Sequence, residues 1–166
     1  MIRPMTAKDS MHVQQIVCKT WSATYKDIIP TEIQKKFIDR SYSEAMLLKR
    51  MEKTHVLIAE CEGIPIGFSN FTKKDDDGDA ELTSMYILPS HQKMGYGKEL
   101  VEYALSLLSD AQQLFVYVDE RNASGRAFYE KQGFELLDVF EEYFEGHPVV
   151  TAQYVFYIHS PALALH

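Results

Sequence analysis

The segment HQKMGYGKEL, His91 to Leu100, follows an apolar run and leads into a helical pattern. The run, Glu81 to Pro89, has the composition of a buried strand and ends at a proline. Beyond Gly95 and Gly97, apolar residues recur at helical spacing as far as Leu108. The sequence therefore predicts a strand, a glycine-rich loop and a helix in direct succession.

This order of elements favours an anion-binding loop. The first N–H groups of a helix have no partners and lie at the positive end of its dipole, and glycines let a phosphate approach the backbone. Lys93 and Lys98 add positive charge. Two common nucleotide-binding loops do not fit this segment. A dinucleotide-binding fingerprint needs a third glycine where Leu100 stands. A P-loop needs a glycine where Gln92 stands and a serine or threonine where Glu99 stands.

The remaining pattern is Q-x-x-G-x-G, Gln92 to Gly97, which resembles the acetyl-CoA loop of the GNAT superfamily of N-acetyltransferases. A second segment, Asn122 to Phe134, resembles the other diagnostic pattern of that family, N-x-x-A-x-x-F-Y-x-x-x-G-F. It differs at Gly125, where the family usually has alanine; glycine should loosen the helix by up to about 1 kcal/mol. The resemblance covers residues 2 to 158, and the chain is identified as a member of this superfamily.

The rest of the chain reads as helices followed by alternating strands and helices. The expected elements are a helix over 6–25, a second helical region over 31–51 with an interruption near 39–42, strands over 55–61, 64–71 and 80–88, the helix after the glycine loop, a strand over 114–119, a helix over 123–132, and strands over 135–140 and 149–159. This order predicts an α/β (α+β) fold. The resemblance implies a GNAT-type mixed, mostly antiparallel twisted sheet flanked by helices. It also implies a first strand over residues 2–5 and splayed central strands that hold the cofactor.

Composition predicts one globular domain over residues 1–160 and a short C-terminal tail over 161–166. The N-terminus lacks the apolar core of a signal peptide, and no run approaches the roughly 18 apolar residues of a membrane span. We therefore expect a cytoplasmic protein with no membrane partner. The net charge of −7 argues against a nucleic-acid partner and is compatible with a cationic acceptor.

The two cysteines, Cys18 and Cys61, lie in apolar-periodic segments and lack the spacing of a metal site. We expect reduced, packed thiols and no metal. Neither cysteine lies in a recognised nucleophile context, which favours direct acetyl transfer over a covalent enzyme intermediate.

The resemblance implies where acetyl-CoA would bind. Backbone N–H groups of the glycine loop would hold the pyrophosphate, and the main chain of the preceding strand would pair with the pantetheine arm. Asn122 would add a contact, and it can also cap the helix that begins at Ala123. The expected cofactor-binding residues are Met85, Tyr86, Ile87, Gln92, Lys93, Met94, Gly95, Tyr96, Gly97, Lys98 and Asn122.

Two residues are candidates for catalysis. Tyr129 matches the tyrosine that many GNAT enzymes place near the thioester sulfur, where a phenol could protonate the departing thiolate. The alternative is a purely packed aromatic beside Phe128. Glu81 occupies the place of the catalytic glutamate in several histone-acetylating relatives and could take the amine proton through one water. The alternative is a solvent-facing residue that continues the acidic turn over 75–79.

These assignments predict an acetyl-CoA-dependent N-acetyltransferase that acts on a primary amine, with a small cationic acceptor such as a polyamine or amino-sugar. Acetylation of a protein N-terminus or lysine is one alternative, and a non-catalytic acyl-CoA-binding module is another. Relatives build the acceptor pocket from the first two helices and the last hairpin, which here include Trp21, Tyr25 and residues 143–150. A core role is favoured for Trp21. The closing strands are candidates for a homodimer contact.

Overall fold

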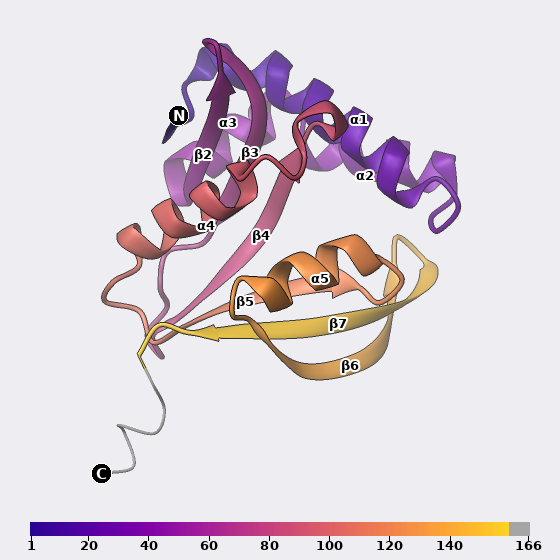
Figure 1. The fold of residues 1–166 in the computed structure, drawn as a ribbon. Coiled ribbons are helices and arrows are strands. Elements are labelled where there is room, and N and C mark those ends of the chain that lie inside the picture. The colour runs from indigo at the N-terminus through magenta and orange to yellow at the C-terminus, as the bar shows by residue number, and fades with distance from the viewer. Residues whose placement is uncertain (160–166) are drawn as a thin grey trace.

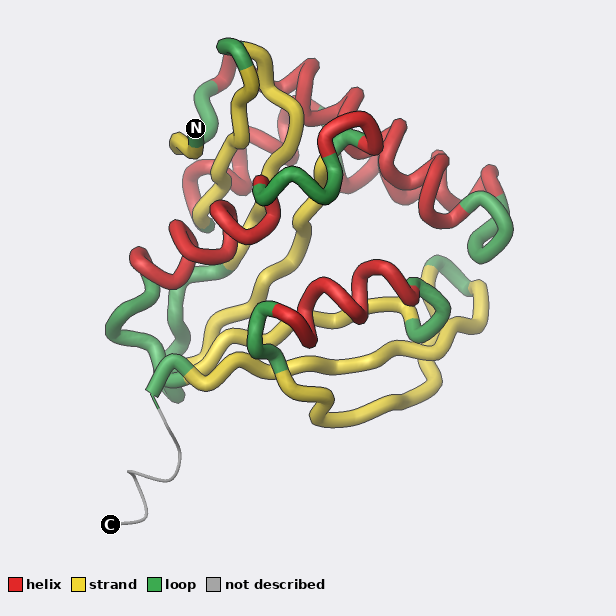
Figure 2. Tube along the Cα trace, viewed as in Figure 1, coloured by secondary structure: helices red, strands yellow, loops and turns green. Residues whose placement is uncertain are grey.

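The computed structural model describes residues 1–159, and its elements follow one another as strand, three helices, three strands, helix, strand, helix and two strands. In chain order they are β1 (Ile2–Pro4), η1 (Ala7–Asp9), α1 (Ser10–Tyr25), α2 (Thr31–Ser41), α3 (Glu44–Lys53), β2 (His55–Cys61), β3 (Ile64–Phe71), β4 (Asp79–Ile87), η2 (Pro89–His91), α4 (Tyr96–Leu107), β5 (Gln113–Asp119), α5 (Ala123–Lys131), β6 (Glu135–Phe144) and β7 (His147–Tyr157). Here η marks a short 3₁₀ turn. The predicted α/β fold is confirmed (Figures 1 and 2).

The seven strands form one sheet in the order β1-β2-β3-β4-β5-β7-β6. All neighbouring strands are antiparallel except β4 and β5, which are parallel. These two strands pair only from Asp79–Gln113 to Leu82–Val116 and then separate (Figure 1). The expected splay between the fourth and fifth strands is confirmed. It divides the molecule into a half built on β1 to β4 and a half built on β5 to β7.

Two hydrophobic cores cover the two faces of the sheet. The helices α4 and α5 lie on one face, where Leu100 and Tyr129 join a core with β5 and β7. The helices α1 to α3 lie on the other face of β2, β3 and β4, where Val17 and Leu47 pack against Ile58. We call these the α4/α5 face and the α1 face.

A β-bulge in β4 exchanges the faces of its side chains. The register between β3 and β4 shifts after the pair Phe71–Leu82, so that Asn70 pairs with Ser84. Before the bulge, Leu82 belongs to the α4/α5 core. After it, Tyr86 packs in the α1 core. This bulge was not predicted from the sequence.

The closing hairpin is longer than predicted. Glu145 and Gly146 both have positive φ, 50° and 78°, and form a two-residue turn of the kind that joins strands tightly. His147 and Pro148, which precede the predicted start of the last strand at residue 149, therefore belong to β7. Strand β6 therefore continues to Phe144 and β7 begins at His147, whereas the predicted strands ended at residue 140 and began at residue 149.

The expectation for Cys18 was wrong. Its side chain is exposed because it lies on the outer side of α1, whose inner side carries Val13, Ile16 and Val17. Cys61 is half-buried at the end of β2, and both residues are free thiols. The predicted tail, residues 161–166, lies outside the described residues.

Two further expectations concern partners. No helix among residues 1–159 is long and apolar enough to cross a membrane. The homodimer contact stays a prediction. The edge strand β6 exposes Leu136, Leu137 and Val139 but interleaves them with Glu135 and Asp138, whose charges oppose pairing of this strand with a second copy.

Candidate active site

The glycine loop joins the end of β4 to the start of α4. The side-chain amide of Gln92 donates a hydrogen bond of 2.9 Å to the carbonyl of Ile87 and so ties the loop to the strand. Gly95 is the N-cap of α4, with φ of 94°, and no side chain caps the helix. The N–H groups of its first turn, from Tyr96 to Lys98, therefore point out of the helix start without intrahelical partners. This arrangement suits a phosphate.

Gly97 is closely packed against α5. A Cβ at this position would lie 3.0 Å from two ring carbons of Phe128. The start of α4 therefore sits directly against α5, and the two sequence motifs meet in space. Lys93 and Met94 complete the loop, Lys93 with φ of 62° and Met94 largely exposed.

The strand β4 presents one free edge beside this loop. Met85, Tyr86 and Ile87 pair with β3 on one side. On their other side β5 has already diverged, so within residues 1–159 no strand pairs with this edge. Unpaired N–H and C=O groups along an extended strand can bind another extended chain as an added strand. The pantetheine arm of CoA, with its two amides, has this character.

Asn122 is placed at the start of α5 as predicted. Its side-chain oxygen accepts a hydrogen bond of 3.0 Å from the N–H of Gly125, so its N-cap role is confirmed. A Cβ on residue 125 would lie 2.6 Å from the Asn122 amide nitrogen. An alanine here, as in the family pattern, would require the end of the Asn122 side chain to shift.

Tyr129 lies on the buried side of α5, 7% exposed. Its ring contacts Phe128 and Phe134 edge to face, with centroids 5.2 and 5.3 Å away. Burial raises the pKa of its hydroxyl, and the nearby Tyr25 adds to the rise. The hydroxyl therefore keeps its proton throughout the neutral range but is a weaker acid than a free phenol. The ring of Tyr129 can therefore pack in the core while its hydroxyl serves as a proton donor.

An aromatic cluster on the α1 face adjoins the opening between β4 and β5. Trp21 stacks on Phe37 and packs at a tilt against Tyr25, with ring centroids 4.9 and 4.7 Å away, and lies 6.4 Å from Tyr86. Burial, together with the charge of Asp119, raises the pKa of Tyr25 to about 12. The core role favoured for Trp21 is confirmed by its burial. The side chain of Tyr86 was missed as a component of this face, because its orientation depends on the bulge.

Glu81 lies in the last stretch of β4 that still pairs with β5, opposite Phe115. Because Ala80 and Leu82 face the α4/α5 core, Glu81 faces the opposite side of the sheet from Tyr129. The residue is half-buried, and burial raises the pKa of its carboxyl group. Burial also raises the pKa of the neighbouring Tyr117, with further contributions from Glu81 and Glu142. Glu81 is therefore not a fully solvent-exposed continuation of the acidic turn, because its side chain is half-buried.

Comparison with known proteins decides the family. The model of the Acetyltransferase (GNAT) family matches residues 13–134, a stretch that contains the glycine loop, Asn122 and Tyr129. The chain belongs to the GNAT family of acetyltransferases. It is an acyltransferase that uses acetyl-CoA as co-substrate.

Several relatives of this GNAT enzyme are similar over most of its length. A spermidine N(1)-acetyltransferase from Thermoplasma acidophilum is 27% identical over 145 residues, 82% of this chain and 89% of the relative. An uncharacterized N-acetyltransferase from Mycobacterium tuberculosis is 24% identical over 132 residues, 77% of this chain and 84% of the relative.

Solved structures share the fold of the GNAT enzyme. The PaiA N-acetyltransferase from Thermoplasma acidophilum, solved in complex with coenzyme A, has a TM-score of 0.81 at 24% identity, covering 92% of this chain and 96% of that one. The ribosomal-protein-S18-alanine N-acetyltransferase from Escherichia coli has a TM-score of 0.72 at 17% identity, covering 96% and 94%.

The contact between Gly97 and Phe128 leads to a prediction for the GNAT loop. Gly97→Ala should weaken acetyl-CoA binding by about tenfold or more, because the start of α4 or the Phe128 ring must shift to relieve the 3.0 Å approach. Titration calorimetry with acetyl-CoA measures the effect. The double variant Gly97→Ala/Phe128→Leu should recover part of the affinity. Wild-type affinity in the single variant would contradict this account of the glycine.

Burial of Glu81 leads to a prediction for stability. Because its pKa is higher in the folded than in the unfolded protein, ionisation of Glu81 opposes folding at every pH above the folded value. Glu81→Gln should therefore raise the melting temperature at pH 7, and the gain should shrink as the pH falls toward the ordinary carboxyl value of about 4.3. Thermal unfolding at both pH values measures this. Glu135→Gln, an exposed residue of β6, serves as the control and should show no such gain.

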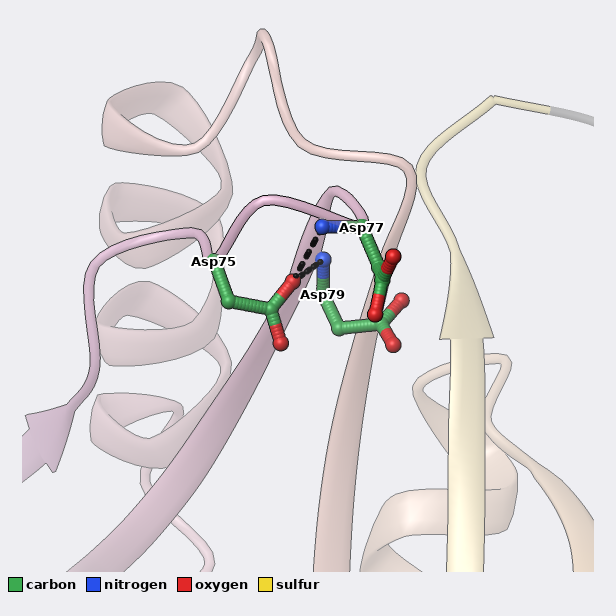
Figure 3. A group of neighbouring side chains, drawn as sticks. All are labelled: Asp75, Asp77 and Asp79. Atoms are coloured by element: carbon green, nitrogen blue, oxygen red, sulfur yellow. Dashed lines mark hydrogen bonds between the residues drawn. The ribbon is translucent and has the colours of Figure 1, made fainter.

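Three carboxylates converge at the turn before β4 (Figure 3). One oxygen of Asp75 accepts hydrogen bonds of 2.9 Å from the N–H groups of Asp77 and Asp79, which closes the turn. Asp79 in turn accepts a bond of 2.8 Å from the side chain of Gln113. This acidic turn lies at the opposite end of β4 from the glycine loop, and its hydrogen bonds account for Asp75 and Asp79 as structural residues.

Proposed function

We propose that this GNAT enzyme transfers the acetyl group directly to a primary amine of a small, linear, cationic acceptor such as a polyamine. The proposal rests on the divergence of β4 and β5, which stop pairing after Leu82 and Val116 and leave one edge of β4 unpaired within residues 1–159. The glycine loop, Phe128 and Tyr129 adjoin it on the α4/α5 face. Tyr25, Tyr86 and Glu81 adjoin it on the α1 face.

In this proposal the two substrates approach the point where β4 and β5 diverge from opposite faces of the sheet. Acetyl-CoA would lie with its pyrophosphate on the loop, Gln92 to Lys98, and its pantetheine along Met85 to Ile87, with Asn122 at its side. An amine that enters from the α1 face then meets the thioester carbonyl where the strands diverge. Holding the two reactants in one place supplies much of the rate enhancement of such a reaction.

The surface beside the opening supports a cationic acceptor. A cavity of about 440 Å³ lies between the end of β5 and the β6–β7 hairpin. Its lining includes Glu120, Glu141 and Glu142, the ring of Tyr143, and one cation, Arg121, which is paired with Asp119. Carboxylates and an aromatic face attract alkylammonium groups. The similarity to a spermidine N(1)-acetyltransferase points to the same class of acceptor.

In the proposed acetyl transfer, Glu81 accepts the proton of the amine and Tyr129 donates a proton to the thiolate. An alkylammonium has a pKa near about 10.4 and must lose a proton before it can attack. The half-buried carboxylate of Glu81 takes that proton through a water. The amine nitrogen forms a bond to the carbonyl carbon, the carbon–sulfur bond breaks, and the thiolate takes the hydroxyl proton of Tyr129. The phenolate of Tyr129 then recovers a proton from solvent.

A protein acceptor is the second candidate, because the chain shares its fold with the ribosomal-protein-S18-alanine N-acetyltransferase. Thiol release from acetyl-CoA distinguishes the two when it is measured against spermidine, putrescine, aminoglycosides, amino acids and short peptides. We expect saturable release with the linear polyamines. Release with peptides alone would show that the acceptor is a protein and not a polyamine. Release with aminoglycosides alone would show that the acceptor is not a linear amine.

A further inference from the structure

A tyrosine hydroxyl of β7 holds two charged residues of α5. Tyr154 is fully buried in the α4/α5 core. Its hydroxyl accepts a hydrogen bond of 2.9 Å from Nε of Arg126 and donates one of 2.8 Å to a carboxylate oxygen of Glu130. The phenol is therefore acceptor and donor at once, which fixes the direction of its O–H bond. We call Arg126, Tyr154 and Glu130 the α5 clamp.

The α5 clamp ties one turn of the helix to the sheet. Arg126 and Glu130 are four residues apart and so lie on the same side of α5. Within residues 1–159 they form no direct ion pair, and the Tyr154 hydroxyl bonds to both. The Arg126 guanidinium also lies over the Tyr154 ring, 6.0 Å from its centroid. Hydrogen bonds to charged groups are stronger than those between neutral groups, so this link is a firm one.

The turn that the clamp holds is the one that carries Tyr129. Of the residues Ala123–Lys131, Tyr129 alone is buried. Its ring contacts Phe128 and Phe134, and such apolar packing holds the helix against the sheet without fixing its rotation, because it is non-directional. Hydrogen bonds depend on direction. The clamp therefore supplies the directional contact between this turn and β7.

The helix needs this support because its own stability is low. It has nine residues with Gly125 in its first turn. Isolated helices shorter than about 12 residues are marginal in water, and an internal glycine weakens them further. The cap by Asn122 fixes the start of α5. The next turn, with Tyr129, depends on contacts with the sheet.

We propose that Tyr154 is a positioning residue for acetyl transfer: through Arg126 and Glu130, its hydroxyl fixes the rotation of α5 and thereby the direction of the Tyr129 hydroxyl. A misplacement of about 1 Å in an active site can lower a rate by about 100-fold, so a small rotation of the helix has a measurable effect. This inference rests on the proposed function, because it concerns the proton donor of the same reaction.

Removal of the Tyr154 hydroxyl provides the test. Tyr154→Phe keeps the buried ring and leaves no charge buried without a partner, since Glu130 is exposed and Arg126 is half-buried. With spermidine, kcat should fall about 5- to 10-fold, while calorimetry gives an acetyl-CoA affinity within twofold of wild type. Tyr157→Phe, on the same strand but the opposite face of the sheet, is the matched control and should keep kcat within twofold.

A double-mutant cycle separates positioning from a general structural defect. In a Tyr129→Phe background, measured at higher enzyme concentration, Tyr154→Phe should lower kcat by less than twofold, because no phenol is left to direct. A general distortion of α5 would lower kcat by the same factor in both backgrounds.

The exposed end of the clamp gives a second pair of variants that do not disturb the core. Glu130→Gln keeps an oxygen that can accept the Tyr154 hydrogen bond and should retain kcat within twofold. Glu130→Ala removes the acceptor and should lower kcat at least threefold, although alanine is the better helix former. Equal kcat in the two variants would overturn the inference.

The failures of the inference and of the proposed function differ. If Tyr129→Phe keeps wild-type kcat, the proposed proton donor is wrong and the inference falls with it. If Tyr129→Phe is slow but Tyr154→Phe is not, or if Tyr154→Phe has the same effect in both backgrounds, the proposed function stands and the clamp does not position Tyr129. If peptides or aminoglycosides react and spermidine does not, the proposed acceptor is wrong, and the same cycle with the reactive amine still decides the role of Tyr154.

Discussion

Tyr129→Phe should lower kcat by at least about 100-fold while it leaves acetyl-CoA affinity within twofold of wild type. The variant removes one buried hydroxyl, which is protonated at neutral pH and is the proposed proton donor, and general acid catalysis typically contributes about 10²- to 10⁴-fold. The ring remains, so its edge-to-face contacts with Phe128 and Phe134 are preserved. Steady-state kinetics with saturating spermidine, together with calorimetry for acetyl-CoA, measure both quantities.

Tyr103→Phe is the matched control for this prediction. Tyr103 lies on α4, half-buried against the same core, and is assigned no role in transfer. It should retain activity within about twofold. A loss of less than threefold in Tyr129→Phe would show that the thiolate obtains its proton elsewhere and that Tyr129 is only a packed aromatic.

Leu100→Ala should lower the free energy of unfolding by about 2–5 kcal/mol, the usual range for a buried leucine truncated to alanine. Leu100 is fully buried on the inner side of α4, in the core shared with β5 and β7. For a chain of this size the loss corresponds to a melting temperature lower by roughly 5–15 °C. Urea unfolding followed by circular dichroism gives the free energy directly.

Leu107 offers the control for this truncation because it lies on the same helix with 43% of its surface exposed. Leu107→Ala should change the free energy of unfolding by less than about 1 kcal/mol, since little apolar surface is returned to water. Similar losses in the two variants would contradict the orientation of α4, and with it the position of the glycine loop.

The fold was predictable wherever local signals were strong. The apolar period changes from helical to alternating at His55, and Glu62–Gly63 marks the first hairpin, which the structure confirms. The glycine loop and the N-cap Asn122 were predicted for the same reason, because loop and cap chemistry depends on residues close in sequence. The splay of β4 and β5 was expected only through the family resemblance.

Features that depend on distant contacts were not predictable from the pattern. The bulge in β4 shows no distinctive residue in the sequence, yet it turns Tyr86 toward the α1 face. The hydrogen-bonded contact between Arg40 of α2 and Glu145 of the β6–β7 hairpin joins residues in separate halves of the molecule, and either residue alone reads as a solvated surface charge. Cys18 was misplaced because a small apolar residue in a helical pattern gives a weak indication of which side is buried.

The central claim, direct transfer to a linear amine from two sides of one opening, is tested most directly by initial rates with acetyl-CoA and spermidine both varied. We expect intersecting double-reciprocal lines, because both substrates must be bound together, and a spermidine product heavier by one acetyl group. Parallel lines, with acetyl retained on the protein after incubation with acetyl-CoA alone, would contradict it.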